Sequence, residues 1–163
     1  MKKFYINERL FTIGDRFQIF RADGSIIYEV KEKLFTFGKQ YRLFNNSGKK
    51  LAFIKQKMFR LLPRYDIYLD NQLVATVKKK FSVFVKKYEI DSAYGNYRID
   101  GDLLAWNFQI LKDENVFCHV SKNFNLFRDK YEVLVSEGYN EILTLCLVII
   151  LDAVHHDGSR HRR

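Results

Sequence analysis

The residues of this 163-residue sequence that could bind a metal ion gather near its carboxyl end, in the segment DAVHHDGSRHRR (152–163). Adjacent side chains on a helix point about 100° apart, so the neighbouring histidines of this segment do not form a preset pair of ligands. His119 is distant in the sequence. We therefore expect no metal ion and no other cofactor. The side chains of metal-binding type in the segment are Asp152, His155, His156, Asp157 and His161.

Asp152 is a separate candidate, because it is a carboxylate at the end of a strongly apolar segment. If that segment is a helix, the dipole near its carboxyl end disfavours a negative charge. We expect Asp152 to be hydrogen-bonded, as a plug at one mouth of the fold. A functional acid is the alternative.

No residue pattern typical of catalysis occurs in the sequence. G-x-S-x-G, H-E-x-x-H and a phosphate-binding glycine loop are all absent, and the eight glycines fall mostly at turns. We therefore expect that the protein is not an enzyme.

Lysine and arginine concentrate in the middle of the chain. Between Lys49 and Arg98 there are twelve Lys and Arg residues against four Asp and Glu residues, in a chain of net charge +9. Such a cluster raises the local concentration of anionic partners. The residues that we expect to bind an anionic ligand are Lys55, Lys57, Arg60, Arg64, Lys78, Lys80, Lys86 and Lys87.

Two kinds of anionic partner fit this cluster. Each Lys or Arg gains roughly 1 kcal/mol near an anionic membrane surface, and nucleic acid attracts the same side chains with a strong salt dependence. We favour anionic lipid and place nucleic acid second. The alternative is that the lysines only prevent pairing of exposed strands and keep the protein soluble.

The basic segment VKKKFSVFVKK (77–87) has the alternation of a strand. In that arrangement Lys78, Lys80, Ser82, Phe84 and Lys86 share one face, and Phe81, Val83 and Val85 share the other. A turn around Lys79 would break this parity.

Strands separated by short turns must position these side chains. Runs rich in Phe, Tyr, Ile and Val are interrupted at regular intervals, which is typical of an all-β domain. Only one proline, Pro63, occurs in the chain. We predict hairpins around Asp23-Gly24, Asn46-Ser47-Gly48, Asp70-Asn71 and Asp113-Glu114-Asn115.

A weak repeat of about 22 to 24 residues runs through these hairpins. In each unit an aromatic residue is followed, six or seven positions later, by a tyrosine that opens a strand. The pairs are Phe35 with Tyr41, Phe59 with Tyr65, Phe81 with Tyr88, and Phe124 with Tyr131; the degenerate LLAWNF near Leu104 fills the gap before the last pair. A meander of about twelve strands either exposes edges or closes on itself, and we predict a closed antiparallel barrel.

The segment ILTLCLVIILDAV (142–154) is apolar on every side of a helix. A membrane-spanning helix needs about 20 apolar residues, and this run is too short. We predict a buried helix over about 139–156 along the barrel axis, with Asn140 as its N-cap, Glu141 in its first turn and Gly158 at its end. Cys118 and Cys146 lie in apolar runs, and we expect reduced core residues.

The chain resembles the LURP-one-related family. The stretches that carry the likeness are LFTIGDRFQIFRADGSIIYEV, LAFIKQKMFRLLPRYDIYL, RDKYEVLV and LCLVIILDAV, in this order, and the likeness spans approximately Phe4 to Asp157. The resemblance implies the fold of the tubby C-terminal domain, a closed barrel threaded by a hydrophobic helix. Tubby domains bind phosphoinositides through basic residues on the barrel, but the resemblance does not carry those residues over to this sequence. The family has no defining catalytic motif.

We expect a single barrel domain over 1–157 and a polar tail over 158–163. The apolar FYI near the start is interrupted by Asn7, Glu8 and Arg9, so we expect no signal peptide and a cytoplasmic protein that can lie at the membrane periphery. The expected function is that of a non-enzymatic binding or scaffolding module for anionic lipid head groups. The alternatives are a nucleic-acid-binding protein and a protein-interaction module with no anionic ligand, whose protein partner the sequence does not identify.

Overall fold

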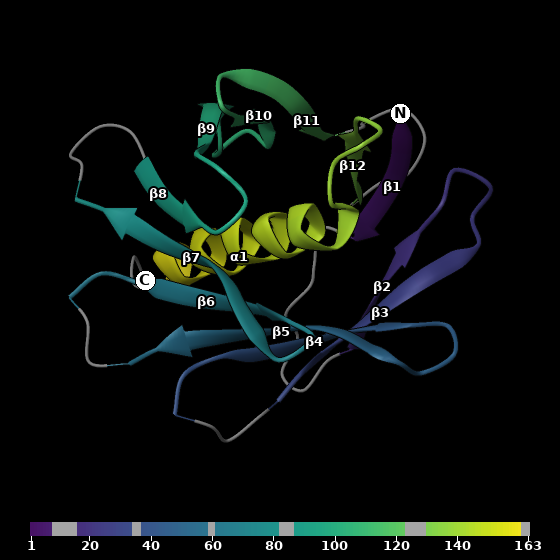
Figure 1. Cartoon of the computed structure of the whole chain (residues 1–163), viewed down its shortest axis with the longest axis horizontal. Coiled ribbons are helices and arrows are strands. Elements are labelled where there is room, and N and C mark those ends of the chain that lie inside the picture. The colour runs from purple at the N-terminus through teal and green to yellow at the C-terminus, as the bar shows by residue number, and fades with distance from the viewer. Residues whose placement is uncertain (8–15, 34–36, 59–60, 82–86, 123–129, 161–163) are drawn as a thin grey trace.

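The computed structural model describes residues 1–7, 16–33, 37–58, 61–81, 87–122 and 130–160. These residues form twelve strands and one helix (Figure 1). The strands are β1 (Lys2–Asn7), β2 (Arg16–Phe20), β3 (Ile26–Glu32), β4 (Gln40–Asn45), β5 (Lys50–Lys57), β6 (Arg64–Leu69), β7 (Gln72–Lys80), β8 (Lys87–Ser92), β9 (Tyr97–Asp102), β10 (Asn107–Lys112), β11 (Asn115–Lys122) and β12 (Lys130–Val135).

Each strand pairs with its neighbours in the sequence, and β1 closes the sheet against β12. The closing pair is antiparallel, with Lys2 opposite Val135 and Asn7 opposite Lys130. Closure leaves no exposed sheet edge, which is the usual liability of a long meander. The predicted closed antiparallel barrel of about twelve strands is confirmed.

Turn chemistry explains why the strands reverse where the sequence predicts. Asp70 and Asn71 have φ of 47° and 64°, and Asp113 and Glu114 have φ of 47° and 65°. Two consecutive positive φ angles are typical of the two-residue turn whose twist matches a tight hairpin, and Asn and Asp tolerate them better than any residue other than glycine. The hairpin predicted around Asp23-Gly24 is also present, with Gly24 at a φ of 81°.

Helix α1 (Glu141–Arg160) passes through the barrel, enclosed by the strands (Figure 1). Its side chains are buried on every face from Leu143 to Val154. The predicted N-cap is present, because Asn140 Oδ1 accepts a hydrogen bond from the Leu143 amide at 3.0 Å. The helix continues through Gly158, where we expected it to end, since glycine weakens a helix interior without by itself stopping it.

The repeat places a tyrosine at the second position of four of the even-numbered strands. Tyr41, Tyr65, Tyr88 and Tyr131 are the second residues of β4, β6, β8 and β12. Three of the four are almost completely buried, and Tyr88 is partly buried. The prediction that these tyrosines open strands is confirmed. The aromatic partners Phe35, Phe59 and Phe124 lie outside the described residues.

The two ends of the barrel differ. At one end, β3 ends beside the start of β4, and the same holds for β5 with β6, β7 with β8, and β11 with β12. We call this the basic end; the C-terminal part of α1 lies there (Figure 1). The opposite end, which we call the turn end, carries the two-residue turns and the first turn of α1. In the described part of the chain, no helix has both the length and the hydropathy needed to cross a bilayer.

Candidate anion-binding face

Six of the eight predicted anion-binding residues lie on four adjacent strands. Lys55 and Lys57 are on β5, Arg64 on β6, Lys78 and Lys80 on β7, and Lys87 opens β8. We call these six residues the basic face. The alternation of buried residues along each strand turns their side chains to the outside of the barrel. Arg60 and Lys86 lie outside the described residues.

Strand register brings residues of the basic face side by side. Lys57 lies opposite Arg64, which in turn lies opposite Lys78. At the strand ends, Lys80 lies directly opposite Lys87. Cross-strand partners on one face have Cβ atoms about 4.5–5.5 Å apart, so three strands contribute cations to one continuous row.

The basic segment 77–87 is not one continuous strand. Strand β7 ends at Lys80, and β8 begins at Lys87. Lys78 and Lys80 do share a face, as expected from alternation within β7. Residues 82–86, which were also predicted to alternate between the two faces, lie outside the described residues. Phe81, predicted on the face opposite to Lys78 and Lys80, is 85% exposed.

A buried carboxylate lies within the basic face, which sequence reasoning did not identify. Asp66 on β6 is only 2% exposed although it points away from the barrel interior. Thr76 Oγ1 donates a hydrogen bond to Asp66 Oδ1 at 3.0 Å. Lys57 Nζ lies 3.2 Å from Oδ2, and Arg64 Nε lies 3.4 Å from Oδ1. Burying a charge requires such partners, so Asp66 pairs with two of the six cations and cancels one unit of their positive charge.

Two further cations of the basic face are paired with acids on β8. Lys78 Nζ contacts Asp91 Oδ2 at 2.5 Å, and Lys80 Nζ pairs with Glu89. The hydrogen bond from Lys78 holds the pKa of Asp91 below its usual value. Of the six described residues of the basic face, Lys55 and Lys87 form no ion pair, although Lys55 lies opposite Asp66 in the strand register. The net positive charge of the basic face is therefore smaller than its composition suggests.

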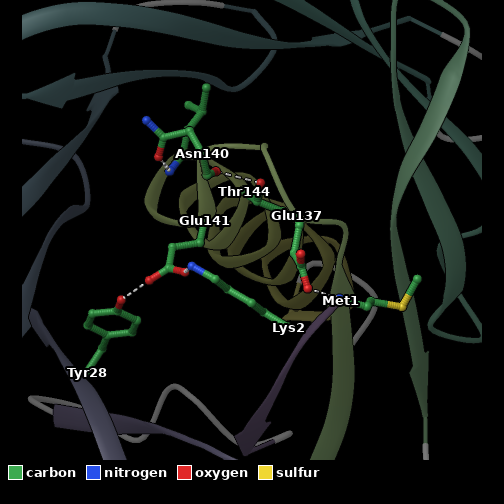
Figure 2. A network of polar contacts seen from close by, with 8 residues as sticks. Met1, Lys2, Tyr28, Glu137, Asn140, Glu141 and Thr144 are labelled. Atoms are coloured by element: carbon green, nitrogen blue, oxygen red, sulfur yellow. Dashed lines mark hydrogen bonds and ion pairs between the residues drawn. The ribbon is translucent and has the colours of Figure 1, made fainter.

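A second polar cluster lies at the turn end, where α1 begins (Figure 2). Glu141 accepts a hydrogen bond from the Tyr28 hydroxyl, and its other carboxylate oxygen lies 2.5 Å from Lys2 Nζ. Figure 2 shows Lys2 and Tyr28 reaching the carboxylate from two sides. The amino group of Met1 also contacts Glu137 at 2.8 Å. These contacts fasten β1 and β3 to the start of the helix.

The electrostatics of this cluster favour an ionised Glu141. Burial acts to raise its pKa, but the hydrogen bonds from Lys2 and Tyr28 and the nearby charges of Lys2 and Arg21 outweigh burial, and the net pKa is lowered. Burial and the same carboxylate raise the pKa of Tyr28. A cavity of about 480 Å³ lies beside Glu141, lined also by Lys2, Lys3 and Arg21. Because Glu141 already pairs with Lys2 inside it, this cavity is a poorer anion site than its lysines suggest.

Asp152 is hydrogen-bonded inside the barrel, as the sequence analysis expected. It is completely buried, and the Tyr131 hydroxyl donates to its Oδ1 at 2.6 Å. The ring of Tyr131 stacks on Trp106 with centroids 4.2 Å apart, and Trp106 meets His155 edge-on at 5.6 Å. No three His, Cys, Asp or Glu residues are grouped for metal binding within the described ranges. His161 lies outside those ranges.

Both cysteines are free and buried in the core, as predicted. Burial raises the pKa of the Cys118 thiol to about 12 and also raises that of Cys146. Neither is a nucleophile at neutral pH, because only the thiolate reacts.

The closed barrel around an apolar helix defines a class of fold, and comparison with known proteins gives the family. The family model "LURP-one-related" matches residues 2–152, so the chain belongs to the LURP-one-related family. "Uncharacterized protein YxjI" of Bacillus subtilis (strain 168) is 31% identical over 159 residues, covering 98% of this chain and 97% of that protein. The family expected from the sequence is confirmed.

A solved structure supports the fold. The X-ray structure of a protein from Arabidopsis thaliana matches with a TM-score of 0.68 and 16% sequence identity, over 94% of this chain and 91% of that chain. At this identity the likeness shows the fold alone. The expected tubby-like barrel is confirmed.

Proposed function

We propose that this protein is a non-enzymatic binding module that attaches to anionic phospholipid head groups through its basic face. The observation that carries the proposal is the register of Lys80 opposite Lys87 at the basic end. Like charges directly opposite each other destabilise a strand pair. Neither strand pairing nor solubility requires two lysines at opposed positions. An anionic ligand bound by both lysines would offset their mutual repulsion.

The ion pairs of the basic face set the strength of binding. Asp66 holds Lys57 and Arg64 at a buried carboxylate, whereas Lys80 pairs with Glu89 at the surface, where an ion pair contributes little. The residues best placed for a ligand are therefore Lys55, Lys80 and Lys87. Three lysines at roughly 1 kcal/mol each give about 3 kcal/mol. A millimolar dissociation constant corresponds to about 4.1 kcal/mol, so charge alone supports only weak, reversible attachment. Such attachment fits a protein at the periphery of a cytoplasmic membrane surface.

Co-sedimentation with vesicles tests this proposal. We expect the protein to pellet with phosphatidylcholine vesicles that contain phosphatidylserine, and to stay in the supernatant with phosphatidylcholine alone. The double variant Lys80→Glu/Lys87→Glu should bind at least about tenfold more weakly, because each reversal replaces attraction by repulsion.

The matched control reverses two charges at the turn end. Lys49→Glu/Lys112→Glu changes the net charge by the same amount, far from Lys80 and Lys87. Its binding should stay close to that of the unmodified protein. Equal losses for both double variants, or no preference for anionic vesicles, would refute the proposal. Preferential binding of nucleic acid, with an affinity that falls steeply with salt, would favour the second-placed function instead.

A further inference from the structure

Large apolar side chains protrude from the barrel at its basic end. Phe37 is 80% exposed between β3 and β4, and Leu61 is fully exposed between β5 and β6. Phe81 is 85% exposed directly after β7, and Leu104 is 62% exposed between β9 and β10. Met58, after β5, is 43% exposed. Five side chains from four separate connections thus reach solvent at one end of the molecule.

Lysines lie beside two of these side chains, whereas Leu104 lies beside Asp102, whose carboxylate accepts a hydrogen bond from the Leu104 amide at 2.8 Å. Lys57 precedes Met58, Lys80 precedes Phe81, and Lys87 lies opposite Lys80 across the strand pair. Exposed apolar residues also occur at the turn end: Ile26, Leu73, Tyr94 and Val116 are 40% to 52% exposed, and Met1, directly before β1, is 66% exposed. That end carries charges of both signs, such as Asp70 and Asp113 beside Lys49 and Lys112. Among the described residues, the three most exposed large apolar side chains, Leu61, Phe81 and Phe37, all lie at the basic end.

An anionic bilayer complements this combination of lysines and exposed apolar tips better than a folded partner does. Its surface offers negative head groups to the lysines, and its hydrocarbon lies a few ångströms deeper, within reach of apolar tips. Exposed apolar surface bordered by polar residues typically marks an interaction site. The tips come from four separate connections, which a fluid surface can accept one by one, whereas a rigid protein partner would need a matching pocket for each.

We propose that the basic end is the membrane-docking end, and that the barrel sits end-on upon an anionic bilayer with Leu61, Phe81, Phe37 and Leu104 inserted among the head groups. This inference rests on the proposed function. It adds an apolar contribution to the binding free energy, beyond the contribution of the lysines. The axis of α1 then points toward the bilayer, with its carboxyl end nearest to it.

The test replaces the apolar tips without changing charge. Leu61→Ser/Phe81→Ser should bind vesicles of phosphatidylcholine and phosphatidylserine at least about tenfold more weakly than the unmodified protein. Both side chains are exposed, so the variant should keep its thermal midpoint. Salt screens charge attraction but not apolar insertion. The unmodified protein should therefore keep part of its binding at high salt, and the variant should lose it.

The matched control is Leu73→Ser/Tyr94→Ser at the turn end, where the same kinds of side chain are 52% and 45% exposed. It should bind like the unmodified protein. A tryptophan at position 81 gives a direct probe: Phe81→Trp should add emission that shifts to the blue with anionic vesicles and is quenched by brominated lipid. Leu73→Trp should show neither effect.

The outcomes separate the two proposals. If Leu61→Ser/Phe81→Ser binds like the unmodified protein while Lys80→Glu/Lys87→Glu binds weakly, insertion is wrong and the charge-based function stands. Equal loss in the turn-end control overturns the end-on geometry. If the unmodified protein does not bind anionic vesicles, or binds nucleic acid instead of them, both proposals are wrong.

Discussion

Asp66 determines how much positive charge the basic face can offer to a ligand. The carboxylate is buried beneath Lys57 and Arg64 and is also bonded to Thr76. The two cations are themselves about one-third exposed, at 39% and 32% of the side chain, so they still contact water. Asp66 therefore has two opposed effects: it stabilises the β5–β6–β7 surface and it withdraws cations from any anionic partner.

Replacing Asp66 by Asn should separate these effects. The variant keeps an acceptor for the Thr76 hydroxyl but loses the ion pairs, and we expect a loss of roughly 1–2 kcal/mol in the free energy of unfolding. The released Lys57 and Arg64 should strengthen binding to anionic vesicles. Urea unfolding and vesicle co-sedimentation measure the two quantities.

Asp100→Asn is the matched control, because it makes the same change of net charge at an exposed position of β9. Its stability should be nearly unchanged and its gain in vesicle binding should be smaller. If Asp66→Asn and Asp100→Asn bind vesicles equally well, the freed cations do not contact the membrane.

At the scale of elements, helix α1 is held at its first turn as well as by its buried sides. Asn140 satisfies the amide of Leu143, and Glu141 places a negative charge where the helix dipole favours it. Glu141 also ties the helix to β1 through Lys2 and to β3 through Tyr28 (Figure 2). The helix start is therefore coupled to the strands that close the barrel.

The lowered pKa of Glu141 predicts how this anchor depends on pH. Because the folded-state pKa lies below the ordinary value of 4.5, the stabilisation is complete above the unfolded-state pKa and disappears as the pH falls through the lower folded-state pKa. Glu141→Gln should lower the thermal midpoint at neutral pH, and the difference from the unmodified protein should shrink in acid. Glu114→Gln removes an exposed partner of Arg98 and is the control. A difference that stays constant down to the acid range would contradict the anchor.

Most of the fold can be predicted from the sequence, because the spacing of apolar residues and the residue types of turns depend only on neighbouring positions. The residue types of Asp70-Asn71 and Asp113-Glu114 predict the two turns. The helix from Glu141 onward is apolar on all sides, which indicates that other elements enclose it. The site is less predictable because pairing is not local. That Asp66 lies beneath Lys57, or that Lys80 faces Lys87, depends on the register of strands. Alternation in RYDIYL gave one usable signal, since it turns Asp66 to the same side as Arg64.

The molecule as a whole has two unlike ends joined by one core. The buried face of every strand contacts a cluster that includes α1, and this cluster reaches from Phe4 near the turn end to Tyr131 and Trp106 at the basic end. The turn end carries the Glu141 network and turns with both acids and lysines, whereas the basic end carries the row of cations on β5 to β8 and the most exposed apolar tips. The proposed end-on docking uses this difference between the two ends and requires no conformational change.

One continuous core predicts one unfolding transition. The single tryptophan, Trp106, stacks on Tyr131 at the basic end, so its fluorescence reports on packing there. Far-UV circular dichroism reports on all strands and on α1. Because the strands close around the helix, neither can lose its partner without exposing the core, and the two signals should change with the same midpoint in urea. Trp106→Phe, which removes the fluorescence, serves to assign that signal. A circular-dichroism transition that persists beyond the loss of Trp106 fluorescence would show that the basic end opens separately, and the barrel would then have two cooperative parts.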